Sequence, residues 1–357
     1  MKKLNVGIAG AGALSDFHIK AYQNNPYVEL AALCDQNITR AREKAELYKI
    51  PKVYESFNDL CANIDIDAVS IITYNCSHMP LSIQALEAGK HVLCEKPPAL
   101  TAEEAQKMAR AARENRRVLM TGFVRRFSEK NMLAKSIIEK HELGDIYYVK
   151  TGFLRRCGCP GGWFADKALS GGGPLLDIGV HMIDQALYLM GRPKPVSVFG
   201  NVNGSVGTRA GVKGFRMYMP ADFAAQDFSS DPVEDFANAL IRFDNGASLF
   251  AEASWTMNIK SDTVYMDMFG DKGGLKVDPT LELFSQHGDY LTDTQPVIID
   301  DDPDFERAFG REIDHFVDCI LRETLCISSI EDGAAVMKII DAIYRSAKTG
   351  DVIRIDS

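Results

Sequence analysis

The glycine-rich segment GIAGAGALSDFH, residues 7–18, constrains the fold more than any other part of the chain. It follows an apolar run typical of a short strand, and a helical pattern comes directly after it. At such a turn, one glycine allows the tight reversal and a second lets a pyrophosphate approach the backbone. Ser15 is a small departure at the third position of the pattern G-x-G-x-x-G/A. The segment therefore predicts a dinucleotide site formed by Gly10, Gly12, Ala13 and Leu14.

An aspartate ends the second predicted strand, VELAALC. A carboxylate at this place can bind the ribose hydroxyls of an adenosine, and it would repel a 2′-phosphate. Arg40 is the only nearby positive charge. We therefore expect Asp35 to favour NAD over NADP. The alternative interpretation is a glycine turn with a structural aspartate.

Apolar runs alternate with helical patterns as far as residue 123, which predicts a parallel sheet covered on both faces. Beyond residue 125 the pattern changes to helices at about 129–140 and 174–190, and then to strands without helices between them. We expect an α/β fold with a dinucleotide-binding domain at 1–124 and an α+β domain, mainly antiparallel, at 125–357. The glycine-rich segment 204–232 is expected to form a loop over a site or an oligomer contact.

Composition excludes several classes of protein. The net charge is −9 and is spread along the chain, which argues against a nucleic-acid partner. No apolar run approaches the ~20 residues that span a bilayer, so we expect no membrane association and a cytoplasmic protein. Only Cys157 and Cys159 lie close together among eight cysteines. Without C-x₂-C pairs we expect reduced thiols and no metal site.

The segment GGGPLLDIGVHMID, residues 171–184, places two acids and a histidine on a predicted helix. Pro174 suits a first helical position, and apolar residues recur every three or four positions. Asp177, His181 and Asp184 then share one face, beside the apolar stripe. This pattern predicts either a helix that lines a cleft with reactive side chains or a helix that makes only local polar pairs.

A second motif, HVLCEKPPAL, sets Glu95 and Lys96 just past the carboxyl end of a predicted strand. In open α/β sheets, ligands bind at that edge. With GIAGAGALSDFH, AGKHVLCEKPPAL, GGGPLLDIGVHMID and the C-terminal EDGAAVMKIIDAIYRSAKTGDVI, the chain resembles the glucose–fructose oxidoreductase / inositol dehydrogenase (Gfo/Idh/MocA) family over its full length.

The resemblance implies a Rossmann domain joined to a domain with an open-faced antiparallel sheet, and a homodimer or homotetramer. It implies hydride transfer between NAD(P) and a carbinol or carbonyl carbon of a sugar, cyclitol or related polyol. By matching positions it also implies that Glu95 and Lys96 contact the cofactor and that the segment TYNCSH, in which Tyr74 replaces a proline, lines its nicotinamide side. The residues carried over from that segment are Thr73, Asn75 and His78.

The same resemblance assigns the catalytic roles. His181 would accept the proton, Lys96 would polarise the substrate oxygen, and Asp177 would bind a hydroxyl or orient the lysine. Asp184 is expected to be structural more often than catalytic. Further substrate contacts are expected from Arg126, Arg155 and Trp163. Trp255 is expected either to stack on a sugar ring or to belong to the core.

Three other hypotheses stay open at this point. One is a glycoside hydrolase or epimerase that recycles a tightly bound NAD, and another is a non-catalytic protein that senses NAD or a sugar. A metal site built from Asp177, His181 and Asp184 is the third.

Overall fold

The computed structural model describes residues 3–207, 233–298 and 306–355. It divides into two compact units, one formed by residues 1–127 and 302–335 and the other by 128–301 and 336–357. The sequence placed all of 125–357 in the second domain. Residues 306–335 instead pack with the first unit, because helix α9 (Glu306–Leu321) buries Phe309, Ile313 and Phe316 in its core.

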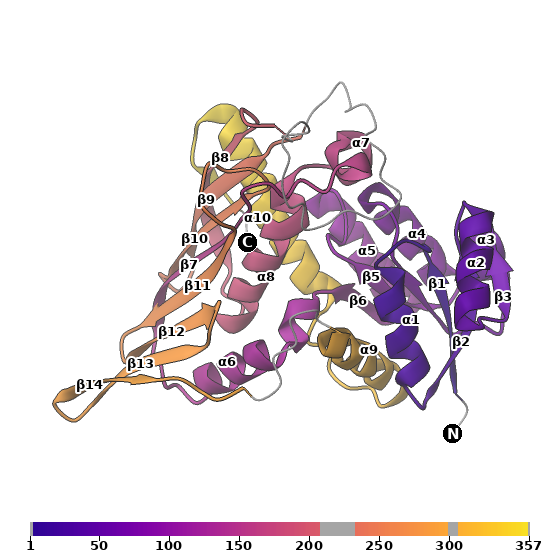
Figure 1. The fold of residues 1–357 in the computed structure, drawn as a ribbon, viewed down its shortest axis with the longest axis horizontal. Coiled ribbons are helices and arrows are strands. Elements are labelled where there is room, and N and C mark those ends of the chain that lie inside the picture. The colour runs from indigo at the N-terminus through magenta and orange to yellow at the C-terminus, as the bar shows by residue number, and fades with distance from the viewer. Residues whose placement is uncertain (1–2, 208–232, 299–305, 356–357) are drawn as a thin grey trace. The chain divides into compact units, whose positions relative to one another are not determined.

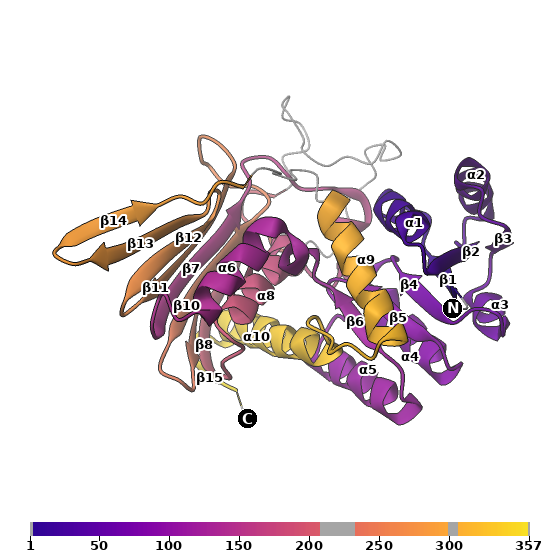
Figure 2. The same cartoon turned by 90° about the horizontal axis from the view of Figure 1, so that it is seen from below.

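The first unit is a parallel sheet with helices on both faces, as expected. Within the described ranges its strand order is β3-β2-β1-β4-β5-β6, and every pair is parallel. Figure 2 shows α1 and α9 on one face of this sheet and α4 and α5 on the other. The strands are β1 (Leu4–Ala9), β2 (Val28–Cys34), β3 (Lys52–Tyr54), β4 (Ala68–Ile71), β5 (His91–Glu95) and β6 (Leu119–Gly122). The other helices are α1 (Ser15–Asn24), α2 (Ile38–Tyr48), α3 (Phe57–Ala62), α4 (Asn75–Glu87), α5 (Ala102–Asn115) and the 3₁₀ turn η1 (Val124–Phe127).

The second unit is built on a larger, mainly antiparallel sheet. The part of the chain that the structure describes gives the order β14-β13-β12-β11-β7-β10-β9-β8-β15, in which only β7 and β10 pair in parallel. Its strands are β7 (Ile146–Leu154), β8 (Pro195–Asn203), β9 (Phe236–Phe243), β10 (Ser248–Ser254), β11 (Thr263–Gly270), β12 (Gly273–Asp278), β13 (Glu282–His287), β14 (Tyr290–Thr294) and β15 (Ile353–Arg354). The segment DNG, residues 244–246, forms the turn that joins β9 to β10, with Gly246 at a φ of 88°.

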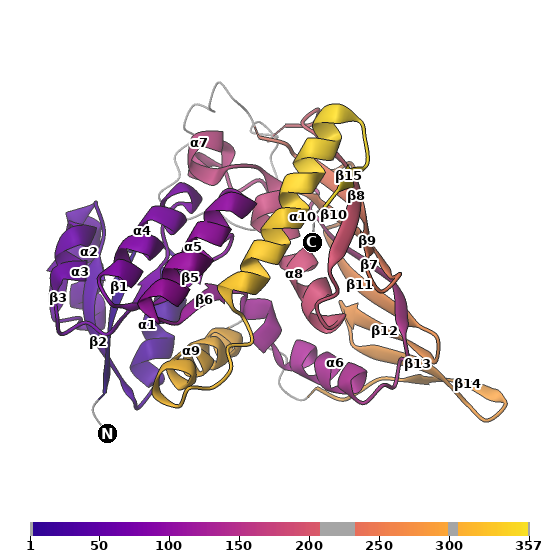
Figure 3. The same cartoon turned by 180° about the vertical axis from the view of Figure 1, so that it is seen from behind.

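Helices cover one face of this second sheet, as Figures 1 and 3 show for α6 and α8. The helical elements are α6 (Glu129–Glu139), η2 (Gly162–Ala165), α7 (Lys167–Ser170), η3 (Leu175–Gly179), α8 (Val180–Leu189) and α10 (Ile330–Thr349), whose last part belongs to this unit. Most of the segment expected to form a loop, residues 208–232, lies outside the described residues. No helix in the described ranges is both long and apolar enough to cross a membrane.

Candidate active site

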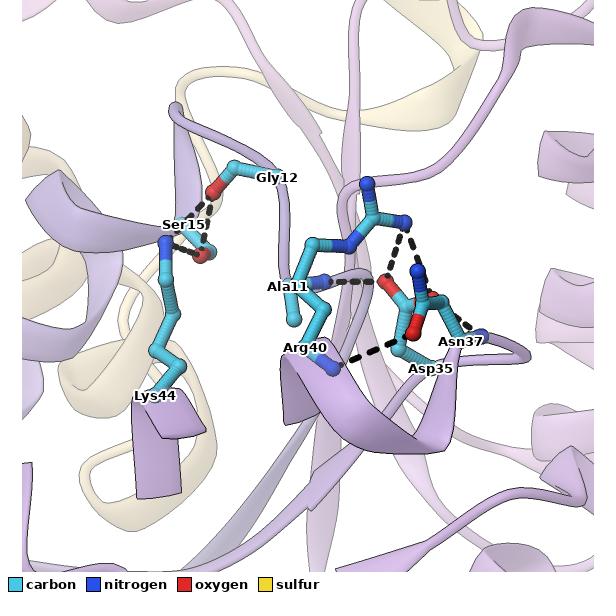
Figure 4. Close-up of polar contacts among 7 residues, drawn as sticks. All are labelled: Ala11, Gly12, Ser15, Asp35, Asn37, Arg40 and Lys44. Carbon is cyan, nitrogen blue, oxygen red and sulfur yellow. Dashed lines mark hydrogen bonds and ion pairs between the residues drawn. The ribbon is translucent and has the colours of Figure 1, made fainter. Parts of the chain in front are cut away.

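The predicted cofactor turn lies between β1 and α1 and needs glycine at two places for different reasons (Figure 4). Gly10 has a φ of 106°, and a Cβ there would lie 2.0 Å from the carbonyl oxygen of Ile72. A Cβ on Gly12 would meet nothing within 4 Å, so the backbone stays open to a ligand on that side. Ala13 is exposed and Leu14 half-buried. The turn therefore has the tight reversal and the open backbone that a pyrophosphate requires.

Asp35 is held at the end of β2 by contacts with this turn. Its Oδ2 accepts a hydrogen bond from the Ala11 backbone at 2.8 Å, and Arg40 binds both carboxylate oxygens at 2.9 and 3.0 Å (Figure 4). The carboxylate side chain is only 9% exposed, whereas that of Arg40 is 41% exposed. Asp35 is thus fixed beside the glycine turn with a cation paired to it.

Lys44 contacts the same turn, which no local sequence pattern indicates. Its Nζ reaches from α2 to the carbonyl oxygen of Gly12 at 2.7 Å and to Ser15 Oγ at 2.9 Å. It also pairs with Asp16 at 2.7 Å. Ser15, the departure from the glycine pattern, donates to the Gly12 carbonyl at 2.6 Å. Serine at this position therefore stabilises the turn, and Lys44, paired with Asp16, connects α2 to it.

The turn after β5 carries Glu95 and Lys96. Glu95 is buried, and its Oε1 lies 2.8 Å from Nε2 of the fully buried His18 on α1. Its Oε2 accepts the backbone N–H of Lys96 at 3.1 Å. Gly122 leaves room for the carboxylate, because a Cβ there would lie 3.1 Å from Glu95 Cδ. Glu95 therefore ties the lysine turn to the helix that follows the glycine turn, and Lys96 itself is half-buried.

His78 joins two backbone turns of the first unit. Its Nδ1 lies 2.7 Å from the carbonyl oxygen of Pro97 and its Nε2 lies 3.2 Å from that of Thr73. Burial lowers the pKa of His78, so the ring is neutral near neutral pH and can donate to only one of these oxygens. Asn75 is buried beside it at the start of α4. Tyr74 has a φ of −67°, the value that a proline would impose, so the substitution leaves the turn's backbone compatible with the family pattern.

Arg126 is fixed by groups of its own unit. Its guanidinium pairs with Asp332 at 2.7 Å and donates to the carbonyl oxygen of Ile327, and its side chain is 1% exposed. These contacts favour a structural role, and the substrate contact of Arg126 stays a prediction. Lys96, the TYNCSH segment and the glycine turn all belong to this same unit.

The helix predicted at 174–190 is present in the second unit, with a difference at its start. Residues 175–179 form a π-helical turn, closed by a hydrogen bond from the Val180 N–H to the Leu175 carbonyl, before α8 continues. Such wide turns are rare and occur often at functional sites. From Gly172 to Leu189, Asp177 and His181 alone escape burial. Asp184 is 1% exposed, in keeping with the structural role expected of it.

The buried Trp255 and the half-buried Glu234 hold this helix start in place. Trp255 Nε1 donates to Asp177 Oδ2 at 2.9 Å, and the indole is 1% exposed. Trp255 is therefore a core residue that positions Asp177, which decides between its two predicted roles. Glu234 Oε1 accepts the Leu175 N–H at 3.3 Å and the Tyr344 hydroxyl at 2.8 Å.

Arg155 and Trp163 lie between β7 and the glycine run. Arg155 is buried, donates to the Gly158 carbonyl at 3.0 Å and lies over the Phe153 ring. Trp163 is half-buried and stacks on Phe164 with ring centroids 3.9 Å apart. Their contact with a substrate stays a prediction.

Nearly the whole chain is similar to known proteins of one family. Residues 4–123 match the Gfo/Idh/MocA model described as an oxidoreductase family with an NAD-binding Rossmann fold, and residues 135–355 match its C-terminal alpha/beta domain. The chain is 34% identical to the D-glucoside 3-dehydrogenase of Escherichia coli, over 97% of this chain and 96% of that protein.

Two solved structures extend this likeness. A levoglucosan dehydrogenase in complex with NADH and L-sorbose superposes with a TM-score of 0.86 at 26% identity, covering 100% of both chains. An aldose-aldose oxidoreductase from Caulobacter crescentus, complexed with glycerol, gives a TM-score of 0.81 at 28% identity over 99% of this chain and 100% of that one.

Proposed function

Because the chain belongs to the Gfo/Idh/MocA oxidoreductase family, we propose that it transfers a hydride between NAD and a carbinol or carbonyl carbon of a sugar, cyclitol or related polyol. One observation carries the proposal. In a stretch that is otherwise buried from Gly172 to Leu189, the two residues left accessible are Asp177 and His181, a carboxylate that can bind a substrate hydroxyl and an imidazole that can accept a proton.

Each residue has a defined part in the oxidation. His181 accepts the hydroxyl proton, since an imidazole can hold it near neutral pH. Lys96 stabilises the negative charge that develops on the substrate oxygen. Asp177, held by Trp255, binds a neighbouring hydroxyl. The nicotinamide cofactor, when bound, accepts the hydride. Gly10, Gly12, Ala13, Leu14 and Asp35 hold it, with Thr73, Asn75, His78 and Glu95 on the nicotinamide side.

NAD is the cofactor that the turn favours. Asp35 can accept hydrogen bonds from the ribose hydroxyls, whereas a 2′-phosphate would face its carboxylate. Arg40 is the one cation within hydrogen-bond distance of Asp35 in the described structure, and that same carboxylate already binds its guanidinium. Lys44 contacts the glycine turn, at the pyrophosphate end rather than at the ribose, and is paired with Asp16.

We expect a homo-oligomer, because the second sheet exposes apolar side chains. Phe199 and Leu240 are 51% and 45% exposed and lie directly opposite each other on neighbouring strands. Phe250 continues the row, opposite Leu240. An apolar patch of this kind is typical of an interface. A cytoplasmic location also stays a prediction.

The test is NADH formation across a panel of D-glucosides, free aldoses and inositols, with NAD and separately with NADP. D-Glucosides come first because of the Escherichia coli relative. His181→Ala and Lys96→Ala should each lower kcat/KM by ~10²–10⁴-fold, the range for a lost acid–base or charge-stabilising group. The matched control is His287→Ala, on an exposed strand of the same unit as His181, and it should leave kcat/KM unchanged.

Activity that survives both substitutions would contradict these catalytic roles. Protein that retains bound NAD through gel filtration but reduces none with any polyol would favour the hydrolase or epimerase. Reversible NAD binding with no turnover would favour the sensor.

A further inference from the structure

Three side chains that bind soft metals converge in the first unit, and none of them is assigned to the cofactor or the substrate. His315 and Cys319 lie one turn apart on α9, and Cys326 follows on the segment that leads to α10. One donor atom from each residue lies within 4.8 Å of the other two. Cys319 Sγ is 3.4 Å from His315 Nε2.

These separations suit one tetrahedral ion. With Zn–S bonds of ~2.3 Å and Zn–N bonds of ~2.0 Å, neighbouring sulfur and nitrogen donors lie roughly 3.5 Å apart and two sulfurs roughly 3.8 Å apart. The observed sulfur–nitrogen distance of 3.4 Å is close to the first value. A shared ion would therefore fit between these two donors once it displaces the Ile327 N–H from His315 Nε2.

Rigid elements hold the three donors. Cys326 precedes a segment that is bonded to the end of β6, where the Thr121 N–H donates to the Ser328 carbonyl at 2.8 Å and Ser328 Oγ donates to the Thr121 carbonyl at 2.7 Å. The Ile327 N–H donates to His315 Nε2 at 3.0 Å, which fixes the ring beside the thiols. Donors arranged in advance lose little conformational entropy when a ligand binds.

The cluster is reachable by an ion and its thiols are available. Cys319 is 5% exposed, whereas His315 and Cys326 are half-buried. All eight cysteines lie within the described ranges, and none of them is in a disulfide. A fourth coordination position would face the accessible side of the cluster.

We propose that His315, Cys319 and Cys326 bind one zinc ion, with water as the fourth ligand. Thiolate and imidazole donors select zinc over magnesium or calcium, which prefer oxygen. Coordination replaces the hydrogen bond that His315 Nε2 accepts from Ile327. The ion would fasten the end of α9 to the segment that contacts β6, where Arg126 is also held by the Ile327 carbonyl.

The experiment titrates the full-length reduced protein with zinc against a chromophoric zinc chelator. The wild type should withdraw one equivalent, and the double variant Cys319→Ser/Cys326→Ser should withdraw none. Cys157→Ser/Cys159→Ser removes the same number of thiols and should bind like the wild type. His315→Ala should weaken binding beyond the ~10–100-fold typical of a lost outer-shell partner. Cobalt, as a second probe, should give a thiolate charge-transfer band that the first double variant lacks.

Circular dichroism and the melting temperature without metal show whether each variant folds. Cys326→Ser alone, at a half-buried loop position, keeps the test valid if the double variant does not fold. The proposal is overturned if the wild-type protein does not bind one equivalent of zinc tightly. That outcome counts against it even if hydrogen peroxide oxidises Cys319 and Cys326 to a disulfide, which would show only that the two thiols are close. The proposal is also overturned if the folded double variant Cys319→Ser/Cys326→Ser still binds one equivalent of zinc. Loss of zinc binding in Cys157→Ser/Cys159→Ser would overturn it as well.

Discussion

Replacing Trp255 with phenylalanine tests whether the buried indole positions the accessible carboxylate. The change removes the Nε1–H that donates to Asp177 Oδ2 at 2.9 Å and keeps an aromatic ring against Ile178 and Ala253. A hydrogen bond to a charged group contributes ~1.5–3 kcal/mol. If that orientation is needed in the transition state, kcat/KM should fall roughly 10- to 150-fold, since ~1.4 kcal/mol corresponds to a factor of ten.

Stability and activity have to be separated in this variant, because phenylalanine is smaller and leaves a void in the core. Urea unfolding gives the stability, and activity is measured where the variant is fully folded. A double-mutant cycle with Asp177→Ala then isolates the interaction. Trp255→Phe should add little further loss of kcat/KM once the carboxylate is absent.

Trp255 has no positioning role if the effects of the two substitutions on kcat/KM are additive. The same conclusion follows if Trp255→Phe alone leaves kcat/KM unchanged while Asp177→Ala lowers it. In either case the indole would be a packing residue whose hydrogen bond has no bearing on the reaction.

The other predictions concern pH and the cofactor. Burial lowers the pKa of His91 to about 4, so the unfolded chain binds the proton at a higher pH than the folded chain does. The stability that neutral His91 contributes is therefore present above pH ~6.5 and is lost as the pH falls towards 4. His91→Asn should flatten that part of the urea-unfolding profile. Burial raises the pKa of Glu234, so the stability from its protonated form is present at low pH and is lost as the pH rises through the folded pKa. Glu234→Gln keeps the acceptor oxygen and should remove this decline in stability with pH. Glu234→Ala should lower the free energy of unfolding by ~1–3 kcal/mol in the same denaturant assay. Asp35→Ser should lower the ratio of kcat/KM for NAD to that for NADP at least about tenfold, because it removes a charged acceptor and releases Arg40; an unchanged ratio would contradict the assignment of Asp35.

Local patterns were enough to predict the parallel sheet of the first unit. Its strands are short apolar runs that end at glycine or acidic residues, and α5 follows an evident amphipathic pattern. The short elements β3 and α3 were missed, since three to six residues carry too little periodicity. The hairpin of β13 and β14 was missed as well, because several of its side chains are exposed and polar.

Contacts between distant parts of the chain could not be predicted from pattern. The apolar stripe of α9 shows that one face is buried, but not that Phe309 lies against Phe17, almost three hundred positions earlier in the sequence, with ring centroids 5.0 Å apart. Lys44 gives no local sign that it reaches Gly12. The spacing of His315, Cys319 and Cys326 likewise resembles no common metal motif, and the cluster exists only because the chain folds back after α9.

The glycine between Asp177 and His181 has its explanation in packing. A Cβ on Gly179 would lie 3.1 Å from Ala253 Cβ and 3.1 Å from Leu175 Cδ1, tighter than ordinary contact. Its absence lets the π-helical turn lie directly on β10, where Trp255 can reach Asp177. The motif D-x-G-x-H thus combines the two proposed site residues with the small residue that allows their helix to approach the sheet. Sequence spacing placed both groups on one face, but only the packed structure shows why the residue between them has no side chain.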